Sequence, residues 1–275
     1  MRIMTANIAM GLGDMDRLSN NLKGLAAYHS WFALLGVAIP AFRGKYAGAS
    51  YSKYRVDYLT THKNLEPLFQ MIEAESPDIL ILNEVVLPLH GEEVESRLKG
   101  LGFKAISYGR GGKYPNAYIT TYVAAKVDGK PLLVEMPQPP MPACGGGVAG
   151  LRLTNGISVI GAHTAFGGSD LWRGQIKSFA EVAEEERRLG NQVILAGDWN
   201  EVLDVIEKQP DIQRLGFQPV DPQKTVTCPV SVPRLFRRQL DHIFVPKAWN
   251  VESFRTQAFK SDHLAIVSDV SSTGE

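Results

Sequence analysis

The chain has few cysteines, no excess charge of either sign and no long apolar run. Only two of its 275 residues are cysteines, Cys144 and Cys228, and their separation does not match a zinc motif. They could form a disulfide, but such sparse use is typical of two reduced thiols, and we expect a cytoplasmic protein. The N-terminal residues do not resemble a signal peptide, because Thr5 and Asn7 interrupt the apolar stretch.

Basic and acidic residues balance at 29 each. Proteins that bind many phosphates without sequence preference usually carry a basic excess, so the balance argues against a general DNA-degrading enzyme. It leaves room for a small or headgroup-sized phosphoester. The strongest apolar segment, Trp31–Phe42, contains Gly36 and Pro40 and is too short to span a bilayer.

Short apolar runs alternate with helical patterns along the chain, and no internal repeat is visible. Periodic apolar residues predict helices at Lys63–Glu75, Glu92–Leu101 and Gln175–Leu189. The strands that follow them are predicted at Asp78–Leu82, Phe103–Tyr108 and Val193–Ala196. This alternation is typical of an α/β protein, and we expect one domain over residues 1–275.

Polar residues recur where apolar runs end. The motifs are Thr5-Ala6-Asn7, Leu82-Asn83-Glu84, Gly161-Ala162-His163, Gly197-Asp198-Trp199-Asn200, Leu240-Asp241-His242 and Ser261-Asp262-His263. The packing of a hydrophobic core does not require such residues at several strand ends. A metal-assisted reaction on an anionic substrate does need them.

These motifs, in this order, resemble those of the endonuclease/exonuclease/phosphatase superfamily, which includes DNase I-like nucleases, neutral sphingomyelinases, inositol polyphosphate 5-phosphatases and poly(A)-specific deadenylases. The resemblance extends from Met1 to about Asp269. Each motif alone is weak, but six in the right order are specific. His163 stands where the apurinic-site nuclease branch commonly has Tyr, so the match is closer to the DNase I, lipid and inositol phosphatase branches. The resemblance implies a four-layer α/β/β/α sandwich with two packed mixed sheets.

Glu84 matches the metal-binding glutamate of the family, and a hard cation such as Mg²⁺, or Mn²⁺ in its place, prefers oxygen ligands. Asn7 would ligate or orient the same metal without adding charge, and Asp262 would reach it directly or through water. The alternative is that Glu84 is a solvated strand-end residue and that Asn7 forms a turn.

Asp198 and Asn200 are two residues apart, so an extended chain would place both side chains on one face. Asp198 would hold or deprotonate the attacking water, or bind a second metal, and Asn200 would donate to a phosphoryl oxygen. The alternative is an Asx-turn that closes the strand.

The resemblance pairs Asp241 with His263: the carboxylate orients the imidazole, which acts as general base or as a cation beside the phosphate. His163 would stabilise negative charge that develops on the phosphate; otherwise it is a satisfied core histidine. His242 should point to the opposite face of a regular strand.

Arg234, Arg237 and Arg238 precede Asp241, and arginine recognises phosphate with two parallel hydrogen bonds. We therefore predict that they bind substrate, with a solvated basic loop as the equal alternative. Arg152 has weaker support as a site residue.

Two stretches are interpreted as additions. Residues 28–58 are rich in aromatics, namely Tyr28, Trp31, Phe32, Phe42, Tyr46, Tyr51, Tyr54 and Tyr58. Pro137–Gly150 has four prolines and three consecutive glycines, which predicts a loop. The aromatic insertion could contact a membrane interface, cap a pocket, stack nucleic-acid bases or add a core helix.

The sequence thus predicts a divalent-metal-dependent phosphoesterase that uses in-line attack by water. Its substrate would be a lipid or other small phosphodiester; DNA or RNA is the alternative, and a non-catalytic binding module is less favoured because no motif is broken. A peripheral membrane contact fits the insertion, and no obligate protein partner is evident.

Overall fold

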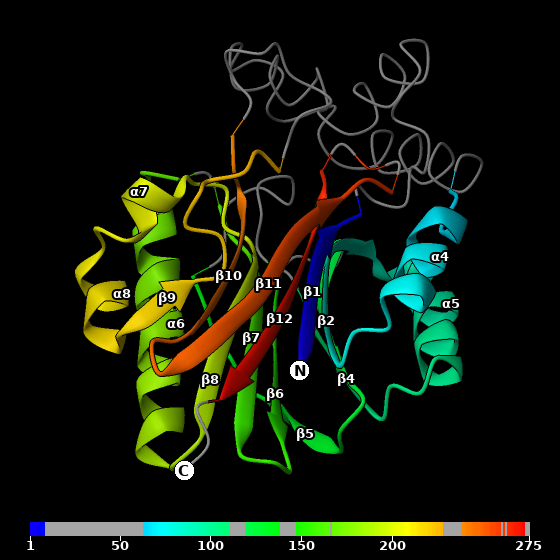
Figure 1. Ribbon diagram of the computed structural model, residues 1–275, viewed down its shortest axis with the longest axis horizontal. Helices are drawn as coiled ribbons and strands as arrows, with labels where there is room; N and C mark the ends of the chain where they lie inside the picture. The colour runs from blue at the N-terminus through cyan, green and yellow to red at the C-terminus, as the bar shows by residue number, and fades with distance from the viewer. Residues whose placement is uncertain are drawn as a thin grey trace, which may run out of the picture.

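The structure, a computed structural model, describes residues 1–8, 63–110, 119–137, 147–165, 167–227, 238–259, 261 and 263–272. The insertion at 28–58 and both cysteines lie outside these residues. The described strands form two six-stranded sheets that pack face to face (Figure 1). The predicted architecture of two packed mixed sheets with flanking helices is therefore confirmed.

Sheet A has the strand order β11 (Trp249–Gln257), β12 (Ala265–Ser272), β1 (Arg2–Asn7), β2 (Ile79–Val86), β4 (Ile119–Ala125) and β3 (Ala105–Arg110). Sheet B has the order β5 (Gly129–Leu132), β6 (Gly147–Leu153), β7 (Ile157–His163), β8 (Gln192–Asp198), β10 (Asp241–Pro246) and β9 (Phe217–Pro219). In each sheet the central pair is parallel, β1 with β2 and β7 with β8, and the outer pairs are antiparallel. The two sheets therefore share one arrangement.

Helices cover the outer face of each sheet. Sheet A packs against α4 (Glu66–Glu75) and α5 (Leu87–Gly100); sheet B packs against α6 (Asp170–Arg188), α7 (Leu203–Ile206) and α8 (Pro210–Leu215). A third cluster, which includes Ile81, Val123, Val159 and Ile194, fills the space between the sheets. Burial of this apolar surface supplies most of the driving force for the layered fold. None of the helices described is long and apolar enough to cross a membrane.

Several boundaries differ from the predictions by a few residues, and three of the differences have a clear local reason. Helix α5 begins at Leu87, because Pro88 in its first turn favours helix initiation before the apolar periodicity becomes visible. Helix α6 begins at Asp170, where Ser169 Oγ caps it by accepting a hydrogen bond from the Trp172 amide at 3.1 Å. The predicted loop over Pro137–Gly150 is wrong at its end, since Gly147–Gly150 is the first part of β6.

Candidate active site

The central strands of both sheets end at the upper edge of the sandwich in Figure 1, and polar residues occupy these strand ends. Asn7 ends β1, Glu84 lies in β2, His163 ends β7 and Asp198 ends β8. The parallel pairs point their carboxyl ends to the same edge, so these residues converge. All four side chains are buried, with at most 6% of each residue exposed.

Asn7 bridges the two carboxylates of this group. Its Nδ2 donates to Glu84 Oε1 at 3.2 Å and to Asp198 Oδ2 at 2.9 Å, so one amide joins sheet A to sheet B. His163 Nε2 lies 3.7 Å from Glu84 Oε1 and 3.8 Å from Asp198 Oδ2. Two acidic groups, an amide and an imidazole therefore face one another in a site largely shielded from water.

A bulge within β2 presents Glu84, which the sequence analysis placed after the strand. The pairing of β2 with β4 shifts between Leu82 and Val85, and Glu84 has a φ of 62°. This left-handed conformation costs a residue with a Cβ about 1–2 kcal/mol and is found mainly where function or packing enforces it. The bulge turns Glu84 toward His163, while the strand continues to Val86.

Asp198 stands between a strained glycine and a buried tryptophan. Gly197 has a φ of 135°, and a Cβ there would come within 2.0 Å of the Ala162 carbonyl oxygen, so only glycine fits. Trp199 packs on the opposite side of the sheet, against Phe179 and Phe244 with ring centroids 5.9 and 5.0 Å away. The apolar anchor fixes the end of β8 and leaves Asp198 in the site.

The sequence predicts an extended chain from Asp198 to Asn200, and this prediction is wrong. Asn200 is left-handed, with a φ of 48°, and its amide N–H donates to Asp198 Oδ1 at 2.9 Å, which is the Asx-turn alternative. Its Nδ2 donates to the Thr164 carbonyl oxygen at 2.8 Å. Asn200 therefore fixes Asp198 and the segment after His163 in this structure.

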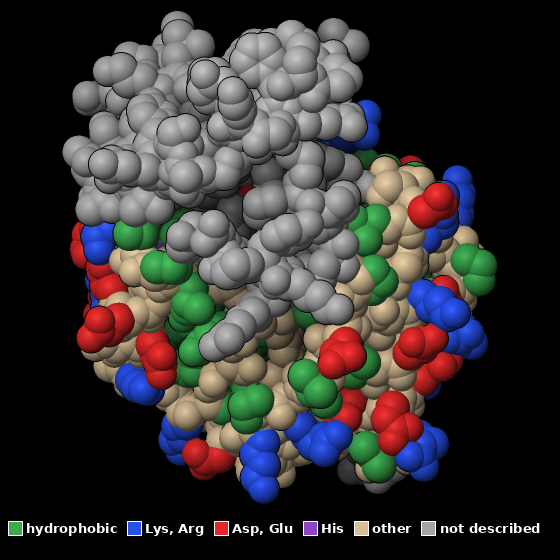
Figure 2. Space-filling view, turned by 180° about the vertical axis from the view of Figure 1, so that it is seen from behind, with side chains coloured by type: hydrophobic (Ala, Val, Ile, Leu, Met, Phe, Trp, Pro, Cys, Tyr) green, Lys and Arg blue, Asp and Glu red, His purple; other side chains and the backbone are tan. Residues whose placement is uncertain are grey.

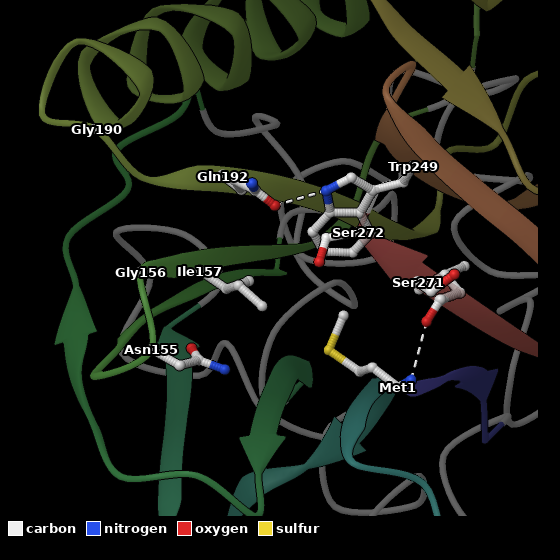
Figure 3. A pocket seen from close by; sticks show the side chains of 10 residues that line it. Met1, Asn155, Gly156, Ile157, Gly190, Gln192, Trp249, Ser271 and Ser272 are labelled. Carbon is white, nitrogen blue, oxygen red and sulfur yellow. Dashed lines mark hydrogen bonds between the residues drawn. The ribbon is translucent and has the colours of Figure 1, made fainter. Parts of the chain in front are cut away.

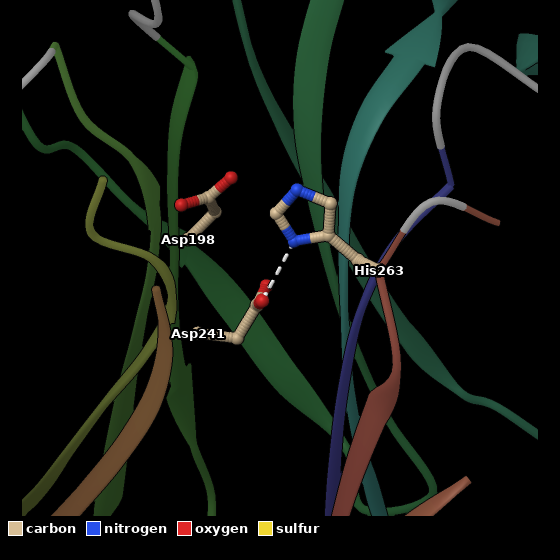
Figure 4. Close-up of side chains that lie close together, drawn as sticks. All are labelled: Asp198, Asp241 and His263. Atoms are coloured by element: carbon tan, nitrogen blue, oxygen red, sulfur yellow. Dashed lines mark hydrogen bonds and ion pairs between the residues drawn. The ribbon is translucent and has the colours of Figure 1, made fainter. Parts of the chain in front are cut away.

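Asp241 and His263 form a buried pair beside Asp198 (Figure 4). Asp241 Oδ2 lies 2.7 Å from His263 Nδ1, and the carboxylate of Asp198 faces the same ring. Asp241 begins β10, and His263 precedes β12, so neither ends an apolar run. Both strands run antiparallel to the central pair of their sheet, so their starts lie at the same upper edge.

Burial raises the pKa of the Asp241 carboxyl above its usual value, and the negative charge of Asp198 raises it further. The His263 imidazole and a hydrogen bond with Thr227 act in the opposite direction. His242 points away, as predicted: its Nε2 contacts the Glu201 carbonyl oxygen at 2.8 Å. Burial lowers the pKa of His242 to about 4, so this histidine is neutral at pH 7.

Asp198, Asp241 and His263 could together hold a metal ion. Each offers one ligand atom, and these atoms all lie within 4.8 Å of one another. Asp241 Oδ1 has no hydrogen-bond partner among the described residues, although it is buried. Carboxylate oxygens with an imidazole suit divalent cations, so the donor set fits a metal, but it does not select the ion.

The structure does not test most of the remaining predicted site residues. Arg238 is exposed, whereas Arg234, Arg237 and Asp262 lie outside the described residues. Arg152 forms an ion pair with Glu186 at the opposite end of the strands. The structure therefore tests no role for the arginines in phosphate binding.

Sequence reasoning missed several residues that support the cluster. Ser261 Oγ donates to the Asn7 carbonyl oxygen at 2.7 Å and accepts from the His263 amide at 3.2 Å. Thr227 Oγ1 accepts a hydrogen bond from the Asp241 amide at 3.1 Å. The Thr227 carbonyl oxygen accepts a hydrogen bond from the Leu264 amide at 2.6 Å. Ser261 lies within a motif already noted, but nothing in the sequence around Thr227 indicates its partners.

A pocket of about 540 Å³ lies at the other end of the strands (Figure 3). It is lined by Met1, Asn155, Gly156, Ile157, Gly190, Gln192, Trp249, Val270, Ser271 and Ser272. Strands β1, β7 and β8 start here and end at the polar cluster. The lining contains no acidic residue and no histidine, so the pocket lacks the groups that mark the upper edge.

The sequence and the fold identify the family. The model of the Endonuclease/Exonuclease/phosphatase family matches residues 4–263 of the chain. The chain belongs to this family. It is accordingly a phosphoesterase of the DNase I-like fold, and the resemblance seen in the motifs is confirmed. No match was found among curated proteins.

Solved structures agree on the fold. A family protein from Leptotrichia buccalis superposes with a TM-score of 0.61 at 12% identity, covering 98% of this chain and 99% of that one. The catalytic domain of human Nocturnin with bound sulfate gives 0.59 at 16% identity, covering 98% and 93%. The 3′ phosphatase NExo from Neisseria, bound to a product DNA hairpin, gives 0.58 at 16% identity, covering 75% and 94%.

Proposed function

We propose that the protein hydrolyses a phosphodiester, or a phosphomonoester, by in-line attack of water with the help of a divalent cation. The observation that carries this proposal is the meeting of Asn7, Glu84, His163 and Asp198 beside the Asp241–His263 pair. Phosphoryl transfer needs mainly positioning and charge stabilisation, and this buried cluster offers both. The fold supports the proposal, but fold alone does not set the substrate.

Glu84 and Asn7 would hold the cation, with Asp262 reaching it directly or through water. Mg²⁺ is the expected ion, and Mn²⁺ would serve as well, because the donors are oxygens of a carboxylate and an amide. When bound, the cation would neutralise phosphate charge and help the leaving oxygen depart. As an alternative to the roles described next, the cluster of Asp198, Asp241 and His263 would hold a second ion.

The protein's own residues would divide the remaining work. Asp198 would align the attacking water, and His163 would donate to the phosphoryl oxygen on which charge develops. Asp241 holds Nδ1 of His263, which leaves the ring's Nε2 side to take a proton from water or to meet the phosphate. Asn200 would act through Asp198, given the hydrogen bond from its amide.

For the substrate we favour a lipid or other small phosphodiester. Figure 2 shows basic and acidic side chains interspersed over the described part of one face, in keeping with the balanced charge. An extended basic track, which nonspecific nucleic-acid binding favours, is not visible on that part of the face. The aromatic residues at 28–58 would supply the apolar contact, including a peripheral membrane contact, in a cytoplasmic protein.

A nucleic acid is the second candidate, because the similar NExo structure holds a product DNA hairpin. Arg234, Arg237 and Arg238 would serve either class, since both carry phosphate.

The deciding experiment measures turnover with Mg²⁺ or Mn²⁺, with and without chelator. The panel should contain a bis-aryl phosphodiester, sphingomyelin liposomes, inositol phosphates, DNA and RNA. We expect metal-dependent release of p-nitrophenol and a preference for the lipid or small diester. Absence of metal-dependent turnover on every substrate would instead favour a binding module on this fold.

A further inference from the structure

We propose that Asn83 is a positioning residue: its side chain fixes Asp198 and the backbone next to His163 at a set place relative to Glu84. The inference rests on the proposed function, because positioning matters only if these residues carry the reaction. Asn83 directly precedes Glu84 within the bulge of β2. It is fully buried and belongs to sheet A, whereas His163 and Asp198 belong to sheet B.

Both ends of the Asn83 carboxamide contact sheet B. Its Oδ1 accepts a hydrogen bond from the Asp198 amide at 3.0 Å, and its Nδ2 donates to the Ala162 carbonyl oxygen at 3.0 Å. Ala162 and Gly197 are paired neighbours on β7 and β8, as are His163 and Asp198. One side chain therefore holds the last residues of both central strands of sheet B.

The third hydrogen bond of Asn83 continues this connection. Asn83 Nδ2 also donates to Thr121 Oγ1 at 2.9 Å. Thr121 Oγ1 in turn donates to the Gly147 carbonyl oxygen at 3.0 Å. Gly147 pairs with His163 across β6 and β7, so Thr121 reaches the same level of sheet B. A Cβ on Gly147 would come within 2.6 Å of Thr121 Oγ1, which shows how closely the sheets approach here.

The pattern is more specific than a general stabilising contact. The Asp198 amide bonds to a side chain of the opposite sheet just after Gly197, whose φ of 135° only glycine adopts readily. The Asp198 amide bonds to the oxygen of Asn83 and the Ala162 carbonyl bonds to its nitrogen, so an apolar residue at this position would remove both hydrogen bonds. Asn83 thus fixes the backbone from which Asp198 projects toward Glu84, whereas Asn7 bridges the two carboxylates themselves.

The test compares kcat and KM for the bis-aryl phosphodiester in the wild type and in Asn83→Ala. Displacement of catalytic groups by about 1 Å can cost about 10²-fold in rate. We expect kcat to fall by about that factor, with KM changed by less than about threefold. An unchanged kcat in folded Asn83→Ala protein, or a loss confined to KM, overturns the inference.

Two further variants guard against effects on folding. Thr121→Val keeps the side-chain volume and removes one support of Asn83, so kcat should fall by about three- to tenfold. If Asn83→Ala does not fold, this variant decides: a wild-type kcat overturns the inference. The matched control is Asn191→Ala, which removes a carboxamide that donates to buried Glu186 Oε2 at 2.8 Å far from the site. It should lower the melting temperature and leave kcat unchanged.

Amide hydrogen exchange, followed by NMR, gives a readout that does not need activity. In Asn83→Ala the Asp198 amide should exchange at least about tenfold faster, while that of Leu195 in the middle of β8 stays protected. Retained protection at Asp198 overturns the inference. If the wild-type protein shows no turnover, the proposed function fails. The exchange measurement would still decide whether Asn83 holds Asp198 in place.

Discussion

The acidic side chains at the two ends of the sandwich have different partners. At the lower end Glu186 accepts hydrogen bonds from Arg152, Ser158 and Asn191. The bond from Arg152, with help from the other two donors, lowers the pKa of Glu186 to about 2. Asp269 on sheet A is only half-buried, but it is held similarly by Arg2 and Ser253, and its pKa is also lowered to about 2.

At the upper end the acidic groups lie against histidines and one another. Within the described residues the ion pairs of Asp198 and Asp241 involve His163 and His263 only, with no lysine or arginine. Burial raises the pKa of Asp241. The protein neutralises its own charge at one end and concentrates acidic groups at the other, as expected if a cation completes the upper end. The lower end would then serve stability and the upper end function.

The largest effect should come from the Asp241–His263 pair. We expect His263→Ala and Asp241→Ala each to reduce kcat by about 10²–10⁴-fold, the range for loss of a general acid or base. The double variant should lose little more than His263→Ala alone, because residues that act as one unit are non-additive. Steady-state kinetics on the small diester measures all three. Additive losses would show that Asp241 does not work through His263.

Glu84→Gln should lose activity mainly through weaker metal binding, because a neutral amide replaces a carboxylate at a hard-cation site. We expect kcat/KM at low Mg²⁺ to fall by about 10²-fold, with partial recovery when Mg²⁺ or Mn²⁺ is raised. Calorimetric titration checks the cause: unchanged metal affinity would refute the assignment. Without metal the variant should be at least as stable as the wild type, because it removes a negative charge near Asp198.

Glu186→Gln tests the lower end. The lowered pKa of Glu186 means that its ionised form stabilises the fold above about pH 4.5, and this contribution is lost as the pH falls toward 2. We expect the variant to be less stable by about 1–3 kcal/mol at pH 7. Urea unfolding at pH 7, 4 and 3 should show that the stability difference between the wild type and the variant becomes smaller as the pH falls. A constant difference, or a changed kcat at pH 7, would break the division between the two ends.

The smallest effect concerns the aromatic insertion, which lies outside the described residues. If residues 28–58 select the substrate, Trp31→Ala or Phe32→Ala should keep the melting temperature and turnover of the soluble diester. Activity on liposomes should fall by about tenfold, since burial of an aromatic side chain contributes about 1.5–3 kcal/mol. A variant that loses about 3–5 kcal/mol of stability and all activities alike would show instead that the segment belongs to the core.

Much of this arrangement could be predicted from the sequence. Apolar runs located the central strands, because the periodicity of a strand is a local pattern that a single sequence displays. The pairing of Asp241 with His263 was implied by the family resemblance alone. The metal, the substrate and the roles of individual residues stay predictions.

Other features depend on contacts between distant segments. The bulge at Glu84 forms where β2 meets β4, and the role of Asn83 depends on backbone groups of β7 and β8. Asn200 follows a strand, and only its left-handed conformation reveals the turn. Asp241 begins a strand, because antiparallel pairing reverses which end lies at the upper edge. Periodicity within one segment carries none of this information.

The position of β12 has a consequence for synthesis. Strand β1 pairs with β12, as Arg2 does with Asp269, and these are the first and last of the described strands. Sheet A is therefore incomplete until β12 has been synthesised. Until then β1 has an open edge on that side, and His263 has not reached Asp241. A chain emerging from the ribosome can form sheet B and its helices first, but it cannot assemble the upper edge. The two sheets therefore contribute all their residues to the upper edge only after the segment from His263 to β12 has been synthesised.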